Sequence, residues 1–379
     1  MTNFYGFLAD TALEFKVITA DGLLRTANAK TNSDLFWALR GGGPAAFAVI
    51  VEATYKTFDD QISSGMTLDI DTTHTTNATL FWEAVTKFHS YSTHFVDNGL
   101  YVYYELGAAG PQVLHVHPIV GVGKTSAQLK AVVQPLFDDL KALGISYTTT
   151  SQDFTTFYDL YNAMFETEVA GNSALTGGWT IGREDVATNH GGIIEAFKTV
   201  INAGSFMVGH MWSAGHGLPQ KEWGNSAVNP RFRKVVDKLI TIVPIGGNAP
   251  LADKAAAQHK LTYVVDGALR AAAPNGAAYI NEVCFFLFFF GCDVWRWCAN
   301  EVVDDRPIRT SRTGRTRFGG RTIRRCSSLG RSMILRGCFT RFRLRVPSNG
   351  SRLRRARGSA SSFDYIFVQL DSVMFASVV

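Results

Sequence analysis

The first 283 residues of the chain contain no cysteine, and the last 96 contain no lysine. A segment without cysteine forms no disulfide, so this part of the sequence does not indicate a redox compartment. No run of apolar residues is long enough to cross a bilayer. The start MTNFYGFLAD lacks the basic and apolar regions of a signal peptide. We therefore expect no membrane partner, and the sequence leaves the cellular location unknown.

The charged residues divide the chain into two parts of opposite sign. Residues 284–379 carry eighteen arginines, six acidic residues and all five cysteines, with a net charge of +12. Residues 1–283 carry 19 basic and 26 acidic residues, a net charge of −7, so the overall charge of +5 describes neither part. The arginines could neutralise nucleic-acid phosphates, but arms that bind nucleic acid usually mix lysine with arginine. We therefore do not expect nucleic acid as a partner.

The arginine-rich tail, residues 284–379, shows no hydrophobic periodicity. Its high net charge opposes collapse, so we predict that it is disordered or poorly packed. Valine followed by cysteine, as at Val283 and Cys284, can be encoded by bases close to a splice donor, and the phenylalanine-rich run CFFLFFFG can be encoded by a pyrimidine tract. Our hypothesis is that the tail is translated intron or a shifted frame, which transcript sequencing across this point tests.

Between residues 59 and 283, apolar residues alternate or recur at helical spacing in successive segments. Strands separated by helices are typical of an α+β lobe in which helices cover one face of an antiparallel sheet. The expected strands are Ser64 to Ile70, Leu100 to Leu106, Val113 to Val120 and Phe206 to Trp212. The expected helices are Ala78 to Tyr91, Ser126 to Leu143, Phe154 to Phe165, Arg183 to Asn202 with an interruption near Gly191 and Gly192, and Pro250 to Ala273.

The stretch from Asn32 to Phe58, NSDLFWALRGGGPAAFAVIVEATYKTF, organises the first part of the chain. Asn32 or Ser33 is expected to cap a short helix by accepting a hydrogen bond from one of its unpaired N–H groups. Three glycines end the helix, and their backbone can approach a flat or phosphorylated ligand because it carries no Cβ atoms. The β-branched run that follows, Phe47 to Tyr55, predicts a buried strand.

Four motifs follow one another in a fixed order from residue 6 to residue 54, two before this stretch and two within it: GFLAD, VITADG, NSDLFWALRGGG and FAVIVEAT. Together they resemble the second half of the flavin lobe of the vanillyl-alcohol oxidase superfamily. The resemblance is closest to the berberine-bridge-enzyme-like oxidases and their fungal isoamyl-alcohol-oxidase-like group. Near residue 280, NGAAYINE resembles the family's GAYxNExD motif, although Cys284 replaces its closing aspartate and Ala48 replaces a usual glycine. The cofactor-binding residues that the resemblance implies for FAD are Gly6, Asp10, Gly41, Gly42, Gly43, Phe47, Val49, Tyr279 and Asn281.

The resemblance also implies a domain order. It predicts the C-terminal half of a PCMH-type FAD-binding lobe at 1–60, a substrate lobe at 61–250, the start of a C-terminal FAD segment at 251–283, and the unrelated tail at 284–379. In the family, the pyrophosphate loop and the histidine and cysteine that bind flavin covalently lie upstream of GFLAD. We therefore expect a half-lobe with exposed apolar strand faces and an open sheet edge, and weak or no FAD binding. Full-length relatives are commonly secreted.

Polar and aromatic side chains on the expected strands are the candidates for chemistry. Side chains two residues apart share one face of a strand, and phenol, imidazole and carboxylate groups can remove a proton from a substrate hydroxyl while its carbon gives hydride to a flavin. Any one of them alone can be an ordinary hydrogen-bonded residue, and as a group they predict a pocket. The candidate catalytic residues are Tyr101, Tyr103, His115, His117 and His210, accompanied by Glu105 and Trp212.

The favoured interpretation is a fragment of an FAD-dependent oxidase that acts on an alcohol or a related small molecule, passes electrons to oxygen, binds no metal and is inactive as it stands. One alternative is a metalloprotein in which His115 and His117 bind a metal ion, with His210 and Glu105 completing the ligand set. A second alternative is a non-catalytic protein that binds a small molecule through the substrate lobe or nucleic acid through the tail. The oligomeric state and the substrate stay open.

Overall fold

A computed structural model describes residues 1–71, 78–107, 112–165, 174–215 and 219–279, together with the backbone of 315–318 and 321–324. The described residues fall into two units, which are residues 1–279 and a short hairpin. The strands are β1 (Ala12–Thr19), β2 (Leu24–Asn28), β3 (Ala48–Tyr55), β4 (Ser63–Asp71), β5 (Leu100–Gly107), β6 (Val113–Val122), β7 (Ser151–Phe154), β8 (Ala174–Gly182), β9 (Phe206–Met211), β10 (Val235–Pro244), β11 (Arg315–Phe318) and β12 (Arg321–Arg324).

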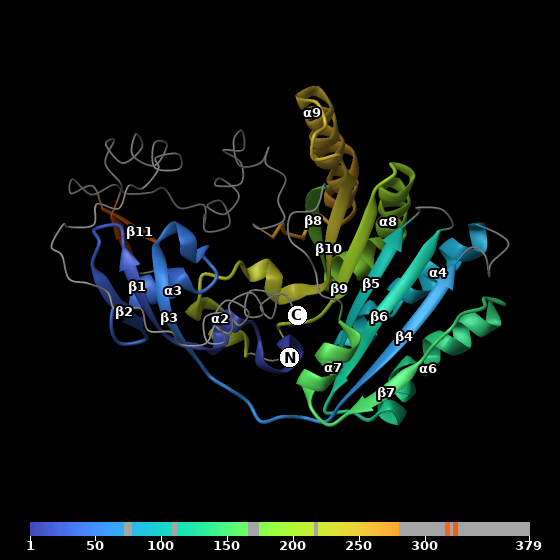
Figure 1. Cartoon of the computed structure of the whole chain (residues 1–379), viewed down its shortest axis with the longest axis horizontal. Helices are drawn as coiled ribbons and strands as arrows, with labels where there is room; N and C mark the ends of the chain where they lie inside the picture. Colours follow the sequence, from blue (N-terminus) through green and yellow to red (C-terminus); the bar gives the residue numbers. More distant parts are fainter. Residues whose placement is uncertain are drawn as a thin grey trace, which may run out of the picture. The chain divides into compact units, whose positions relative to one another are not determined.

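Figure 1 shows the helices of the first unit beside its two sheets. The α-helices are α1 (Thr2–Tyr5), α2 (Leu8–Thr11), α3 (Ser33–Leu39), α4 (Ala78–Ser90), α5 (Ser92–Asp97), α6 (Ser126–Ala142), α7 (Phe157–Met164), α8 (Arg183–Asn202), α9 (Leu251–His259) and α10 (Asp266–Ala272). Short 3-10 helices are η1 (Pro44–Ala46), η2 (Gln220–Asn225) and η3 (Pro230–Lys234), and η4 (Lys260–Val265) is a π-helix.

A three-stranded antiparallel sheet of order β2-β1-β3 holds the first motifs. Between β1 and β2 the chain turns at Asp21 and Gly22, an Asp-Gly pair of the kind that favours tight turns. Gly22 takes a φ of +78°, which favours glycine. Phe15 and Val17 on β1 alternate inward and pack against Phe36 of α3, forming the small core of this sheet.

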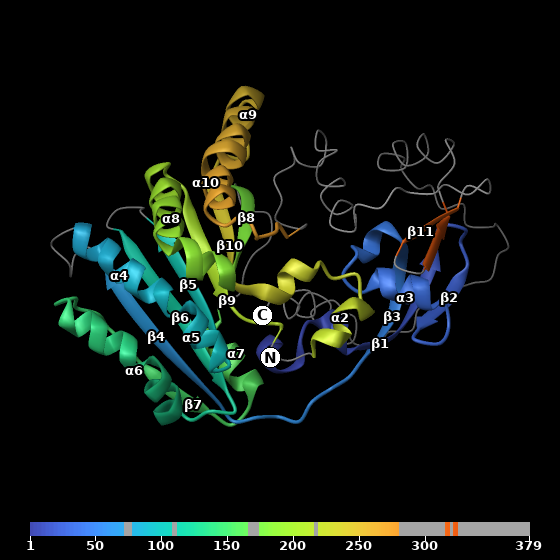
Figure 2. The same ribbon diagram turned by 180° about the vertical axis from the view of Figure 1, so that it is seen from behind.

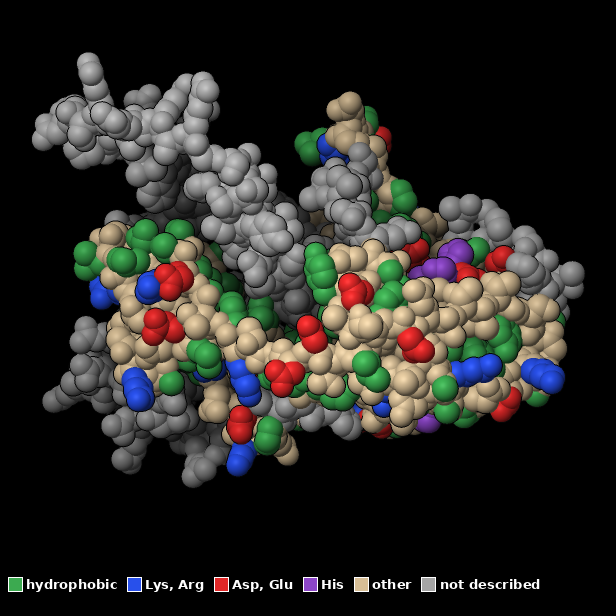
Figure 3. Space-filling view, turned by 60° about the horizontal axis from the view of Figure 1, so that its bottom comes forward, with side chains coloured by type: hydrophobic (Ala, Val, Ile, Leu, Met, Phe, Trp, Pro, Cys, Tyr) green, Lys and Arg blue, Asp and Glu red, His purple; other side chains and the backbone are tan. Residues whose placement is uncertain are grey.

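Two expectations about this sheet are wrong. The helix α3 begins as predicted, but the Asn32 side chain does not cap it. Asn32 adopts a left-handed conformation with φ of 46°, and its Nδ2 donates to the Thr26 carbonyl instead. The strand β3 is an edge strand and not a buried one, with Val49 and Val51 exposed. The predicted exposed apolar faces are therefore present, and hydrophobic side chains lie at the surface in several places (Figure 3).

The large sheet has seven antiparallel strands in the order β7-β4-β6-β5-β9-β10-β8. Figure 2 shows α4, α5, α6 and α8 covering one of its faces. The main core lies between these helices and the sheet, where Phe81, Phe88 and Phe95 of the helices meet the inward side chains of the strands. The predicted antiparallel sheet with helices on one face is confirmed.

Several elements differ from the sequence-based expectation. Strands β2, β7, β8 and β10 were not predicted. The local pattern of β8 is weakened by its paired glycines, and that of β10 by the charged pair Asp237 and Lys238 inside its apolar run. The break in α8 falls at Asn189, with φ of −142°, ahead of the two glycines. The long final helix is present as α9, η4 and α10 in succession.

The second unit consists of the backbone hairpin of β11 and β12, which pair antiparallel from Arg315 with Arg324 to Phe318 with Arg321. Sequence analysis did not predict these strands. The expected disorder of the rest of the tail concerns residues outside the described part of the chain. Within the described part, none of the helices has both the length and the apolar character that a membrane span requires.

Candidate active site

The strands β6, β5, β9 and β10 are neighbours in the large sheet, so their side chains form rows across the face opposite to α4, α5, α6 and α8. Tyr103 on β5 pairs with His210 on β9, and His210 pairs with Lys238 on β10. Directly paired residues on neighbouring strands place their Cβ atoms about 4.5–5.5 Å apart on the same face. The strands that carry Tyr101, Tyr103 and His210 are therefore direct neighbours.

The side chains in this row contact one another directly. The Tyr101 hydroxyl lies 2.8 Å from Nδ1 of His210, and both residues are buried. The Tyr103 ring meets the His210 ring edge to face, with centroids 5.1 Å apart. The Tyr103 hydroxyl donates to Oε1 of Glu105 at 3.2 Å. Phenol, imidazole and carboxylate groups are thus joined in one hydrogen-bonded and aromatic cluster.

The electrostatics of His210 follow from its surroundings. Burial, reinforced by the positive charge of Lys238, lowers the pKa of His210 well below its usual range. The imidazole is therefore neutral at physiological pH and can accept a proton. Within the described part of the chain, its Nε2 and the Nε1 of Trp212, on the same strand face, are buried without hydrogen-bond partners. Orphaned buried nitrogens are uncommon in proteins and favour a bound ligand or water at this place.

Sequence analysis missed Lys238, which is buried at the centre of β10. Its Nζ lies 5.3 Å from the ring centroid of Tyr279, a cation–π contact. A buried lysine is rare unless its charge is used or paired. Lys238 is a charged residue inside the β-branched run VVDKLITIV. Its position would have indicated a buried charge if that run had been recognised as a strand. Tyr279, predicted from its motif, thus joins the predicted tyrosines and His210.

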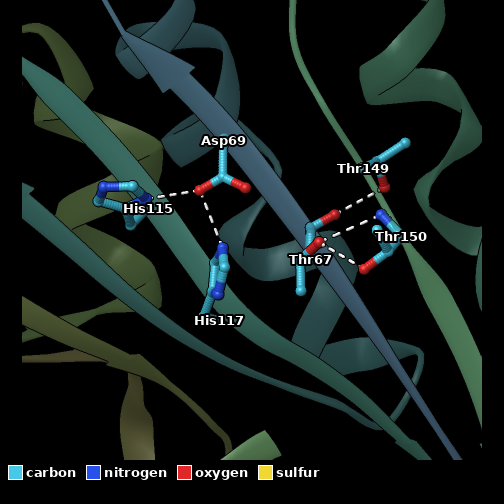
Figure 4. A network of polar contacts seen from close by, with 6 residues as sticks. All are labelled: Thr67, Asp69, His115, His117, Thr149 and Thr150. Carbon is cyan, nitrogen blue, oxygen red and sulfur yellow. Dashed lines mark hydrogen bonds and ion pairs between the residues drawn. The ribbon is translucent and has the colours of Figure 1, made fainter.

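The histidines of β6 lie elsewhere on the same face. His115 Nδ1 and His117 Nε2 both contact Oδ1 of Asp69, on the neighbouring strand β4, at 2.5 and 2.8 Å (Figure 4). The predicted catalytic group is therefore divided into two clusters. The predicted metal-ligand set with His210 and Glu105 is wrong, because His210 contacts Tyr101 and the described residues bring the β6 histidines together with Asp69.

The GFLAD motif packs against the cluster that contains Tyr101 and Trp212. Phe7 meets Trp212 edge to face at 5.2 Å, and Asp10 forms a buried ion pair with Arg233 of η3. Gly6 has φ of +75°, and a Cβ there would lie 2.5 Å from the Asp10 carboxylate. Sequence analysis did not predict this ion pair. The assignment of Gly6 and Asp10 to cofactor binding stays a prediction.

The glycine loop packs against the chain segment before η3. A Cβ on Gly41 would meet Val228 at 2.5 Å, and one on Gly42 would meet the carbonyl of Ala38 at 2.5 Å. Protein packing alone therefore requires glycine at both positions. Gly43, with φ of +77°, has open space on its Cβ side. Of the three predicted cofactor contacts, Gly43 is the one whose bare backbone is available to a ligand.

The other predicted cofactor residues lie near this loop or outside the described chain. Val49 is exposed on β3, and Phe47 is exposed directly before it. Asn281 lies outside the described residues. Residues 224–232 contact both the helix α3, which precedes the glycine loop, and Tyr279. Trp37 of α3 donates a hydrogen bond to the Gly224 carbonyl, and the ring of Phe232 in η3 contacts the ring of Tyr279.

Comparison with known proteins identifies the class. The chain is 31% identical to FAD-linked oxidoreductase sor8 of Hypocrea jecorina over 75% of its length, and 29% identical to FAD-linked oxidoreductase ZEB1 of Gibberella zeae over 75%. The alignments cover 48% and 49% of those proteins. The crystal structure of the VAO-type flavoprotein MtVAO615 from Myceliophthora thermophila C1 superposes with a TM-score of 0.65 at 27% identity, covering 74% of this chain and 51% of that one. No protein-family model matches the chain.

The homologues of this chain are therefore FAD-linked oxidoreductases of the vanillyl-alcohol-oxidase and berberine-bridge-enzyme-like type, which confirms the resemblance seen in the motifs. They support FAD as the cofactor. The chain spans about half the length of the relatives it matches.

The residues present suit a flavin ring. Two orphaned buried nitrogens, His210 Nε2 and Trp212 Nε1, and the buried ammonium of Lys238 offer polar groups to a ring that carries carbonyl oxygens and nitrogens. Tyr279 adds an aromatic surface beside Lys238, and Gly43 offers an unobstructed backbone.

Proposed function

We propose that the chain is part of an FAD-dependent oxidase that acts on a CH–OH or related CH–NH carbon of a small molecule and passes electrons to oxygen. The observation that carries this proposal is the buried cluster of Tyr101, His210 and Lys238 on the sheet face, in a chain whose homologues are FAD-linked. Alcohol oxidation needs a group that takes the hydroxyl proton and a positive charge that stabilises the oxygen as the proton leaves.

The cluster supplies both requirements. Tyr101 can receive the substrate proton on its hydroxyl oxygen and pass its own proton to Nδ1 of His210, 2.8 Å away. Burial and the charge of Lys238 keep His210 neutral, so it can accept this proton, although the same two causes make it a weak base. The ammonium of Lys238, next to His210 in the row, stabilises the negative charge that develops on the substrate oxygen. FAD bound at this site would supply the acceptor for the hydride of the substrate carbon.

The proposal has a second part, which concerns this chain as it stands. We infer that it binds FAD weakly or not at all and shows no turnover, because the apolar edge strand β3 is exposed and two of the three loop glycines serve protein packing. The purified full chain should contain far less than one flavin per molecule by its visible absorption. A stoichiometrically yellow preparation would contradict this part.

The site assignment is tested separately at saturating added FAD. The fraction of FAD that binds is mixed anaerobically with a panel of primary and secondary alcohols, and bleaching of the flavin absorption is recorded. Any bleaching should be reduced by roughly 10²–10⁴-fold in Tyr101→Phe, the range for loss of general acid–base catalysis. The control is His259→Gln at an exposed position on helix α9. Equal bleaching in Tyr101→Phe, Lys238→Met and the control would refute the assignment.

A further inference from the structure

A second cluster on the same sheet face has the composition of a metal site. Asp69 on β4 pairs directly with His115 on β6, and His117 follows two residues later on the same face. One ligand atom from each of the three side chains lies within 4.8 Å of the others. Figure 4 shows both imidazole rings turned toward the carboxylate. From this geometry we propose that Asp69, His115 and His117 bind a divalent first-row transition metal ion, with zinc as the preferred ion.

The chemistry of the donors selects this class of ion. Two imidazole nitrogens and one carboxylate oxygen suit zinc and its neighbours, whereas calcium and magnesium prefer oxygen ligands alone. Zinc binds imidazole nitrogen and carboxylate oxygen at about 2.0–2.2 Å, which places tetrahedral ligand atoms roughly 3.3 Å apart. The observed nitrogen-to-oxygen distances of 2.5 and 2.8 Å need to open by less than about 1 Å to admit the ion.

The backbone under the cluster is held on both sides. Asp69 pairs with His115 on β6 and, through two backbone hydrogen bonds of 2.9 and 3.1 Å, with Thr148. Two residues before Asp69 on β4, Thr67 forms hydrogen bonds with Thr149 and Thr150, which hold β4 to the segment that contains Thr148 (Figure 4). Ligands on strands with fixed register lose little conformational freedom when the ion binds.

Access and remaining coordination positions also fit. The side chains of His115, His117 and Asp69 are 48%, 47% and 28% exposed, so an ion can enter from solvent and keep a water ligand. Within the described part of the chain, the second carboxylate oxygen of Asp69 has no hydrogen-bond partner. Three protein ligands with an open fourth position is the arrangement of zinc sites that keep a reactive or exchangeable water.

The site is distinct from the row of Tyr103, His210 and Lys238 and is separated from it by Glu105. Glu105 pairs with His115 across the strands and accepts the hydrogen bond of Tyr103. The metal proposal does not rest on flavin binding or on oxidase activity, so the two can fail independently.

Isothermal titration of the full chain with zinc chloride tests the proposal. The five cysteines are first alkylated with iodoacetamide, because thiolates would bind zinc themselves. We expect one zinc ion per chain. The variants His115→Gln, His117→Gln and Asp69→Asn should each weaken the affinity by at least about tenfold, and the double variant His115→Gln/His117→Gln should lose the site.

The matched control is His259→Gln, which removes an exposed histidine on α9 and should leave the titration unchanged. All three ligands are surface side chains, so the variants are expected to fold, and circular dichroism checks this. Absence of zinc binding to the alkylated chain would overturn the proposal. Equal binding by the control and the double variant would also overturn it, since the ion would then lie elsewhere.

Discussion

The ion pair between Asp10 and Arg233 joins two segments that are far apart in the sequence, and its removal should strongly destabilise the chain. Nη1 and Nη2 of Arg233 donate to the two carboxylate oxygens of Asp10 at 2.5 and 2.6 Å. The two side chains are 0% and 5% exposed. Asp10 also accepts a bond from the backbone N–H of Phe7 at 2.7 Å, and the guanidinium lies over the Phe7 ring. Asp10→Asn is the perturbation, because it removes the charge and keeps an acceptor for that N–H.

The expected magnitude follows from burial. Removing one partner of a buried ion pair leaves the other charge without compensation, which costs about 3–5 kcal/mol. Domains are typically stable by about 5–15 kcal/mol, so a large part of the total would be lost. With an m-value near 3 kcal/mol per molar urea, the unfolding midpoint should fall by roughly 1–2 M. Trp212, which contacts Phe7, contributes a fluorescence signal close to the substitution.

Two further variants decide whether burial is the cause. Glu52→Gln breaks the exposed pair with Lys16, whose side chains are 53% and 42% exposed, and should leave the midpoint almost unchanged. The double variant Asp10→Asn/Arg233→Met should be more stable than Asp10→Asn alone, because no unpaired charge remains. If Asp10→Asn shifts the midpoint no more than Glu52→Gln does, the reasoning from buried charge is refuted.

Three other predictions concern stability and solubility. Burial, and the neighbouring His89, lower the pKa of His190 from 6.5 to about 4. As the pH falls below 6.5, the unfolded chain therefore binds a proton at this residue before the folded chain does. The free energy of unfolding should thus decrease by about 1–2 kcal/mol, after allowance for partial exposure, between pH 6.5 and pH 4. Urea unfolding curves at pH 6.5 and pH 4 check this, and His190→Gln should remove the dependence of stability on pH in this range. Tyr104→Phe deletes a buried 2.6 Å hydrogen bond to Asp237 and should cost about 1.5–3 kcal/mol in the same melts; an unchanged midpoint would contradict it. Val51→Lys places a charge on the exposed edge strand β3 and should raise the monomer fraction in size-exclusion chromatography, whereas an unchanged aggregate peak would count against edge pairing.

The sequence predicted most of the elements that carry side-chain chemistry. Alternation placed Tyr101 and Tyr103 on one face of β5, and His115 and His117 on one face of β6, as the structure has them. The motif order identified the class through residues that are near one another in the chain. The strands that were missed, β8 and β10, have glycines or charges inside their apolar runs, so their local pattern is weak.

Which strands become neighbours was decided by tertiary structure. Nothing local indicates that Lys238 lies beside His210, that Asp69 lies between His115 and His117, or that Asp10 pairs with Arg233 223 residues later. These contacts depend on sheet order and on which side chains are buried together, and both are set by long-range packing of the whole unit.

By itself, the sequence indicated the class of its homologues and the face of each strand on which its polar residues lie, because short-range periodicity and motif spacing are properties of neighbouring residues. Only the tertiary structure decided that the predicted catalytic residues form two clusters, one around a buried lysine and one around a half-buried carboxylate. It also showed that two of the three glycines serve protein packing. The physical reason is that charge, burial and close approach depend on partners brought together from distant parts of the chain.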